Sequence, residues 1–365
     1  MLDHVKNFFI NLLTGASVVS ALLLVAVGYS DRLDPVSFPL LACIGMFFPV
    51  FILSNIFFLI ILVIVRWKRI WIPLVGFALA YVPVRTYFPI NMGGEPPAGC
   101  IKVVSYNVCA FGGNYKYDDA VDTVADYLKR LDADIVCLQE DMGGKGGNGF
   151  EKMKELYPYN DTVHVSTSPL VINAVGIHTR YPIIRKERID YDSSTNGSVA
   201  YFLQVGTDTV LVINNHLEST HLSDDMRQRY KEVLKGEMEQ EEAEAQMHSI
   251  FGKLSESMGK RGPQAEAVSH YVETYSQYPI ILCGDFNDTP ISYARHTIAR
   301  NLTDCFVSSG CGLGLSYNQK GFTFRIDNIM CSDHFEPYGC RVDDEMDASD
   351  HYPIFCWLKR IENVK

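Results

Sequence analysis

Two long uncharged apolar runs, over residues 8–29 and 38–65, constrain this 365-residue chain more than any other feature. A helix of about 20 apolar residues spans the hydrocarbon core of a bilayer, so both runs predict transmembrane helices. A third apolar run, over residues 70–88, is interrupted by two prolines, which membrane helices tolerate. The sequence therefore predicts a transmembrane region of three helices over residues 1–90.

A cleaved secretory signal peptide is the alternative interpretation of the first run. Such a peptide needs a basic start, a short apolar core and a cleavage site of small residues. Here Asp3 accompanies Lys6 ahead of the run, residues 28–30 are Gly-Tyr-Ser, and further apolar runs follow. These features favour a helix that is retained.

The basic residues predict the orientation of this region. Arg66, Lys68 and Arg69 lie between the second and third apolar runs, and basic residues between membrane helices mark the cytoplasmic side. The amino terminus is then cytoplasmic as well, and everything after Arg85 is extracytoplasmic. We therefore expect an integral protein of the plasma or inner membrane, with its catalytic domain outside the cytoplasm.

A linker rich in Gly and Pro, over residues 91–99, separates the membrane region from a soluble domain over residues 100–361. Residues 1–90 have a net charge of +3, so the whole-chain charge of −11 leaves −14 for the remainder. Proteins that neutralise nucleic-acid phosphates need clustered Lys and Arg. The charge therefore argues against nucleic acid as the favoured partner.

Within the soluble domain, apolar segments end repeatedly in a polar residue. Residues 280–283 predict a buried strand that runs directly into Gly-Asp-Phe-Asn. Asp285 and Asn287 are two positions apart, so an extended backbone points both side chains the same way, at the strand end where open α/β sheets place their chemistry. An ordinary polar turn explains any one such position, but not all of them together. The positions are Asn107, Glu140, His216, Asp285, Asn287, Asp327, Asp350 and His351.

Other segments predict the surroundings of these strands. Residues 199–205 and 209–214, separated by Gly-Thr-Asp, predict a hairpin. The charged residues 223–258 predict a solvated helix, and residues 261–275 a further one. The glycine-rich stretch 143–149 lacks the ending of a phosphate-binding loop, so it predicts a flexible loop near a site. In an extracytoplasmic domain, disulfides 305–311 or 331–340 are compatible with the cysteine spacing.

Six short motifs occur in order through residues 100–360. They are Tyr-Asn at 106–107, Leu-Gln-Glu at 138–140, Asn-His-Leu-Glu-Ser at 215–219, Gly-Asp-Phe-Asn at 284–287, Arg-Ile-Asp-Asn-Ile at 325–329 and Ser-Asp-His-Tyr-Pro at 349–353. Six ordered motifs are far more specific than one. The series resembles that of the endonuclease/exonuclease/phosphatase superfamily, which includes deoxyribonuclease-I-like nucleases, abasic-site endonucleases, neutral sphingomyelinases and inositol-polyphosphate phosphatases. The resemblance implies an α/β fold, a four-layer α/β sandwich of two mixed β-sheets flanked by helices.

The resemblance also implies a metal site. Glu140 resembles the principal Mg²⁺ ligand of the family, with Asn107 beside it and Asp350 near the same ion. Mn²⁺ is the alternative ion. Phosphoester hydrolysis benefits from a hard cation on a non-bridging oxygen, and Mg²⁺ prefers few carboxylates plus waters.

The resemblance assigns catalytic roles to the other five positions. His351 resembles the general acid/base that acts at the phosphate, and Asp327 resembles the carboxylate that orients it. Asp285 resembles the residue that positions or deprotonates the attacking water. Asn287 and His216 are expected to contact phosphate oxygens. A His–Asp pair holds an imidazole in one tautomer, and fixed donors stabilise developing charge.

These observations predict a membrane-anchored, metal-dependent phosphoesterase in which water attacks phosphorus directly. The expected partners are the membrane and a phosphodiester or phosphomonoester, with lipid headgroups or other small phosphoesters as the first substrate class. An extracytoplasmic endonuclease or exonuclease is the alternative. A catalytically silent binding module on the same fold is the second alternative, which the intact set of motifs disfavours.

Overall fold

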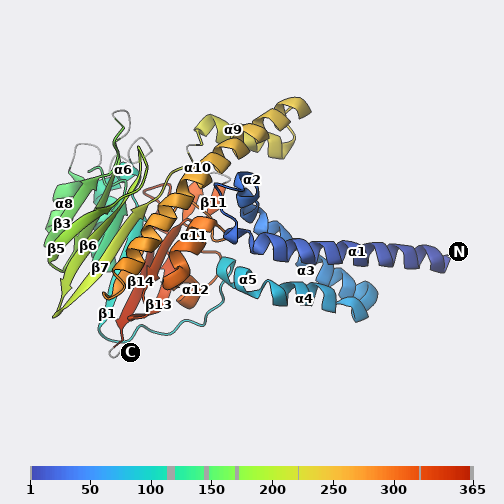
Figure 1. Cartoon of the computed structure of the whole chain (residues 1–365), viewed down its shortest axis with the longest axis horizontal. Coiled ribbons are helices and arrows are strands. Elements are labelled where there is room, and N and C mark those ends of the chain that lie inside the picture. The colour runs from blue at the N-terminus through green and yellow to red at the C-terminus, as the bar shows by residue number, and fades with distance from the viewer. Residues whose placement is uncertain are drawn as a thin grey trace.

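The computed structural model describes residues 2–112, 120–143, 148–168, 172–220, 222–319 and 322–361. Most of the glycine-rich stretch 143–149 lies outside these residues. The helices of the amino-terminal region project from one side of a larger α/β domain, with the amino terminus at their far tip (Figure 1).

The amino-terminal region is helical. Its α-helices are α1 (Leu2–Gly28), α2 (Pro39–Ala42), α3 (Phe48–Arg66), α4 (Trp71–Leu79) and α5 (Tyr81–Tyr87), with 3-10 turns η1 (Ser30–Arg32), η2 (Cys43–Phe47) and η3 (Trp67–Arg69). By length and composition, two helical segments suffice to cross a membrane, His4–Arg32 and Pro39–Arg69.

Two of the three predicted helices are interrupted rather than continuous. Within residues 38–65, Pro39 begins α2 and Pro49 lies in the first turn of α3, with η2 between them. Proline has no N–H to donate, so it suits the first turn of a helix and interrupts its interior. The third run breaks at Ala80, because Pro83 cannot donate the hydrogen bond that would continue α4 into α5.

The described part of the domain contains two six-stranded mixed sheets. The first has the order β13-β14-β1-β2-β4-β3 and the second β5-β6-β7-β8-β12-β9, while β10 and β11 form a separate hairpin. The pairs β1–β2 and β7–β8 are parallel, and the other neighbours are antiparallel. The strands are β1 (Cys100–Asn107), β2 (Ile135–Gln139), β3 (Tyr159–His164), β4 (Ala174–Thr179), β5 (Ile183–Ile189), β6 (Gly197–Val205), β7 (Asp208–His216), β8 (Ile280–Asp285), β9 (Thr303–Asp304), β10 (Tyr317–Gln319), β11 (Phe322–Phe324), β12 (Asp327–Cys331), β13 (Phe335–Val342) and β14 (Ile354–Arg360).

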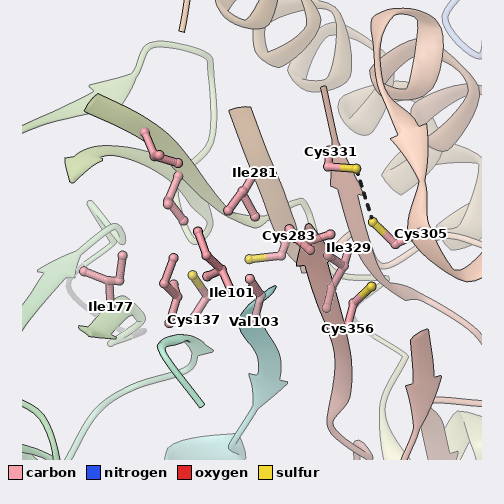
Figure 2. Close-up of a cluster of buried hydrophobic side chains, with 14 of the residues drawn as sticks. Ile101, Val103, Cys137, Ile177, Ile281, Cys283, Cys305, Ile329, Cys331 and Cys356 are labelled. Carbon is pink, nitrogen blue, oxygen red and sulfur yellow. Dashed lines mark hydrogen bonds between the residues drawn. The ribbon is translucent and has the colours of Figure 1, made fainter. Parts of the chain in front are cut away.

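The inner faces of the two sheets pack against each other. Val103 and Cys137 from the first sheet meet Ile281 and Ile329 from the second in a fully buried core (Figure 2). Helices cover both outer faces: α7 (Ala120–Leu131) and α8 (Gly149–Leu156) on the first sheet, α10 (Gln240–Thr274) and α11 (Tyr293–Ile298) on the second. Burial of these apolar faces drives the stacking, and the result is the predicted four-layer sandwich.

The charged segment after β7 differs from its prediction. Instead of one helix over 223–258 and another over 261–275, the chain forms α9 (Asp224–Lys235) and a single α10 of 35 residues that runs through Pro263. Gly236 ends α9 with a left-handed φ of 69°, a conformation that glycine adopts without steric cost. The stretch around the motif 325–329, apolar enough to predict one strand over 322–330, forms two strands, β11 and β12.

The cysteines are all free. Neither spacing-compatible disulfide, 305–311 or 331–340, is formed. The Sγ of Cys305 lies 3.7 Å from that of Cys331, because α12 (Cys305–Ser309) packs its first turn on β12 (Figure 2).

The helical region is fixed to the α/β domain by specific contacts. The guanidinium of Arg325 donates to the carbonyl oxygens of Thr86 and Tyr87 at the end of α5. A side chain at Gly45 would overlap the backbone of Ile291, so only glycine permits this approach. The helices therefore hold a defined position beside the domain.

Candidate active site

The predicted polar residues converge on one edge of the sandwich. β1 ends at Asn107, β2 ends directly before Glu140, β7 ends at His216 and β8 ends at Asp285. Because β1–β2 and β7–β8 are parallel pairs, their carboxyl ends lie at the same edge. β12 runs antiparallel to β8 and places Asp327 opposite Asp285.

One cavity of about 210 Å³ opens at this edge. Asp327 lies behind it, hydrogen-bonded to a residue of the wall. The structure therefore brings all eight predicted residues together. Those that line the cavity are Asn107, Glu140, His216, Asp285, Asn287, Asp350 and His351.

His351 forms a buried pair with a carboxylate. Its Nδ1 lies 2.9 Å from Asp327 Oδ2, and its Nε2 lies 3.6 Å from Asp285 Oδ2. Burial alone would lower the pKa of His351, but the carboxylates of Asp327 and Asp285 outweigh it and raise that pKa to about 10. The ring is therefore an imidazolium at neutral pH, with Asp327 fixing its orientation.

Asp285 occupies the centre of the polar wall. Its Oδ2 accepts from Asn107 Nδ2 at 3.1 Å, and its Oδ1 accepts from the backbone N–H of Asn287 at 2.7 Å. Burial raises the pKa of Asp285, although the neighbouring His351 opposes the shift. A buried carboxylate with a raised pKa is a stronger base than an exposed one.

The expected extended backbone from Asp285 to Asn287 is not what the structure contains. β8 ends at Asp285, and Asn287 has a left-handed φ of 52°. The Asn287 side chain turns back and donates from Nδ2 to the carbonyl oxygen of Leu217 at 3.0 Å. A tight turn, closed by the hydrogen bond between the two residues, therefore brings Asn287 to the cavity.

His216 is held by a residue that the sequence did not single out. Its Nδ1 lies 3.1 Å from Asn173 Nδ2, which donates, so the proton of the neutral ring sits on Nε2. Burial lowers the pKa of His216, and its Nε2 lies 3.8 Å from Asp285 Oδ2. His216 thus presents a neutral N–H donor to the cavity.

Glu140 and Asp350 supply carboxylate oxygens of the kind expected of a Mg²⁺ or Mn²⁺ site, whereas the Oδ1 of Asn107 accepts from the backbone N–H of Cys109 at 3.0 Å. Asn107 Nδ2 donates to Glu140 Oε1 at 3.2 Å. Burial raises the pKa of Glu140, and the nearby negative charge of Asp350 raises it further. Two carboxylates side by side in a cavity repel each other until a cation neutralises them. Few carboxylates and open access to water are what Mg²⁺ prefers, so these residues fit the ion.

A second cluster of possible metal ligands lies in and behind the polar wall. Ligand atoms of Asp285, Asp327 and His351 lie within 4.8 Å of one another. The hydrogen bond between His351 Nδ1 and Asp327 Oδ2 also suits the cluster to proton transfer.

Two further contributions were missed from the sequence. Arg261 on α10 is buried, with Nε 3.0 Å from Asp288 Oδ2 and Nη1 donating to the Glu218 carbonyl oxygen at 2.9 Å. It ties together the loops after β8 and β7. Asn173 directly precedes β4, whose amino end meets the carboxyl end of antiparallel β2. Asn173 could have been predicted from this position beside a strand end. Nothing in the sequence around Arg261 indicated a role for it.

Known proteins share this fold. The human Nocturnin catalytic domain with bound sulfate anion matches with a TM-score of 0.52, 14% identity, and coverage of 73% of this chain and 96% of that chain. TDP2 from D. rerio, complexed with single strand DNA product, matches with a TM-score of 0.51, 14% identity, and coverage of 72% and 99%. The endonuclease/exonuclease/phosphatase from Bacteroides vulgatus matches with a TM-score of 0.50, 16% identity, and coverage of 72% and 99%.

Sequence comparisons divide the chain in two. Curated protein sequences give no match. A family model described as a domain of unknown function (DUF8431) matches residues 9–87. The model of the Endonuclease/Exonuclease/phosphatase family matches residues 104–248 and 262–351, which include all eight predicted site residues. This second match covers more than half of the chain, which therefore belongs to the endonuclease/exonuclease/phosphatase family.

Proposed function

We propose that this protein is a membrane-anchored, Mg²⁺- or Mn²⁺-dependent phosphoester hydrolase in which water attacks phosphorus directly. The observation that carries the proposal is the arrangement of one cavity wall. His351, which is paired with Asp327 behind it, and Asp285 line the same cavity as the adjacent carboxylates of Glu140 and Asp350. Such an arrangement supplies an acid, a base and a cation site around one phosphate.

The ion would be held by Glu140 and Asp350, with Asn107 beside them as a hydrogen-bond donor to Glu140. When bound, it would neutralise charge on the phosphate oxygens and stabilise the transition state. The chain's own donors act beside it, since His216 directs a neutral N–H into the cavity.

Proton transfer is assigned to two residues. Asp285 orients the attacking water and accepts its proton as the new O–P bond forms. His351 donates its Nε2 proton to the leaving oxygen as the old P–O bond breaks, and Asp327 stabilises the imidazolium before that transfer. General acid–base groups of this kind contribute about 10²–10⁴ to a rate.

Lipid headgroups or other small phosphoesters are the proposed substrates. The net charge of −14 outside residues 1–90 disfavours a polyanion. The alternative is an extracytoplasmic nuclease. It is supported by the fold that this chain shares with D. rerio TDP2, a protein whose structure contains single strand DNA product.

Membrane anchoring is proposed from the surface of the helices. Leu22 on α1 and Ile64 on α3 are 64% and 76% exposed, among many large apolar side chains on the same helices. Soluble monomers rarely expose apolar patches of this extent. Between the helices, buried Asn55 donates to the Ser20 carbonyl oxygen at 2.9 Å, a type of contact that joins membrane helices.

The positive-inside rule places the catalytic domain outside the cytoplasm. Fusions of alkaline phosphatase and of green fluorescent protein to the carboxyl terminus, expressed in bacteria, test this placement. We expect active phosphatase, which needs disulfides formed outside the cytoplasm, and no fluorescence. Fluorescent fusions without phosphatase activity would reverse the proposed topology.

Hydrolysis by the purified full chain in nanodiscs tests the function. Bis-p-nitrophenyl phosphate, sphingomyelin, phosphatidylinositols and plasmid DNA are incubated with the protein in Mg²⁺, in Mn²⁺ and in EDTA. We expect turnover of at least one phosphoester that stops in EDTA and returns with added ion. A folded protein that hydrolyses none of them would support the binding-module alternative, and cleavage of DNA alone would support the nuclease.

A further inference from the structure

The active-site cavity has a second, apolar wall. Besides the polar residues it is lined by Met46, Leu222, Leu254, Met258, Phe322 and Phe324. A site that bound only a hydrophilic phosphoester would gain nothing from this surface, whereas an apolar ligand group would be removed from water against it.

This wall is built at the junction between the two parts of the chain. Leu254 and Met258 are four residues apart on α10, so they share one helix face. Both are buried in a cluster with Ala42 and Cys43 from the amino-terminal region, against which Met46 packs. The amino-terminal region therefore supplies part of the cavity wall as well as the proposed anchor.

Met46 links the apolar wall to exposed apolar residues at the end of the proposed membrane helices. Met46 lies in η2, two residues before α3 begins, at the domain end of the proposed membrane helices. In the preceding α2, Leu40 and Leu41 are 67% and 46% exposed, and Phe47 is also exposed. In Figure 1, α2 lies between α10 and the projecting helices. Exposed apolar side chains at this level are suited to the boundary between headgroups and acyl chains.

We propose that the apolar wall binds the hydrocarbon part of a lipid phosphoester from the surrounding bilayer, with its phosphate at Glu140, Asp285 and His351. The inference rests on the proposed function and narrows its substrates to membrane amphiphiles. The polar wall recognises the phosphate, and the wall around Met46 selects for the attached hydrocarbon. The junction at α2 lets the lipid reach the site without leaving the bilayer surface completely.

Binding of two non-hydrolysable phosphonates tests the proposal. Methylphosphonate and hexylphosphonate are titrated calorimetrically into the full chain in phosphatidylcholine nanodiscs with Mg²⁺, and titrations into empty nanodiscs are subtracted. Because only hexylphosphonate reaches the apolar wall, we expect it to bind at least tenfold more tightly.

Single substitutions test whether the apolar wall causes the tighter binding of hexylphosphonate. Met46→Gln keeps the length of the side chain but adds a polar amide, and we expect it to reduce the hexyl-over-methyl preference at least threefold. Leu254→Asn is the second variant on the same wall. Met92→Gln is the matched control, because Met92 is 100% exposed in the linker and outside the cavity, and it should keep the parent preference.

The outcomes separate the inference from the function on which it rests. Equal affinities of the two phosphonates, or a preference unchanged in both wall variants, would overturn the lipid inference while metal-dependent hydrolysis of bis-p-nitrophenyl phosphate stands. If the protein neither hydrolysed bis-p-nitrophenyl phosphate nor bound methylphosphonate, the proposed function would be wrong, and the lipid inference would fail with it.

Discussion

Replacing Glu140 by glutamine is expected to lower metal-dependent phosphoester turnover at least about a thousandfold, a loss of about 4 kcal/mol of transition-state stabilisation. Glutamine keeps the size of the side chain but removes the charge that a Mg²⁺ ion needs. In the metal-free protein the same change relieves the repulsion by Asp350 that raises the pKa of Glu140. The variant should therefore be no less stable than the parent in EDTA.

Thermal unfolding provides the second measurement for Glu140. An ion at about 100 times its Kd stabilises the folded state by about 2.7 kcal/mol, so the parent Tm should rise by several degrees in Mg²⁺ and the Glu140→Gln Tm should not. Glu151→Gln is the matched control, since Glu151 is exposed and pairs with Lys154 across the surface of α8. Equal Mg²⁺ stabilisation of Glu140→Gln and the parent would argue that the ion binds elsewhere.

Replacing His351 by glutamine is expected to produce a loss that depends on the leaving group. An alkoxide is a poor leaving group that needs a proton, and the raised pKa of His351 keeps that proton available at neutral pH. Hydrolysis of glycerophosphocholine, measured by product release, should therefore fall at least about a hundredfold. Hydrolysis of bis-p-nitrophenyl phosphate should fall much less, because p-nitrophenolate leaves without protonation.

Two further variants test whether the loss in His351→Gln comes from proton donation. Asp327→Asn retains the imidazole but removes the carboxylate that lies 2.9 Å from its Nδ1, so it should show a smaller loss with the same leaving-group dependence. His270→Gln, at an exposed position on α10, is the matched control and should resemble the parent. Equal losses for the two substrates in His351→Gln would mean that this residue stabilises phosphate charge without donating the proton.

Much of the fold was predictable because its signals are local. The apolar runs that form β1, β2 and β8 each end in a polar residue, and strand burial follows from such patterns. Helix boundaries were less predictable. Pro83 broke the third run, whereas α10 continued through Pro263, since tertiary packing of α10 on the second sheet outweighs the lost hydrogen bond.

The eight predicted site residues were identifiable because they occupy six short ordered motifs, and each sits at or near a strand end. Their partners were not identifiable in this way. Asn173 and Arg261 act through contacts with His216 and Asp288 that lie 43 and 27 positions away along the chain. The apolar wall combines Met46 with Leu254 and Met258, which are adjacent only because η2 packs on α10.

The sequence by itself determined the division of the chain into an apolar helical region and an acidic α/β domain, and it determined which polar residues end the strands. Hydrophobic periodicity and short motifs carry that information within a few residues. Only the tertiary structure decided that the domain edge and the helical region share one cavity. That choice depends on contacts between distant segments, such as Gly45 against Ile291 and Arg325 against the end of α5, whose close packing no local pattern specifies.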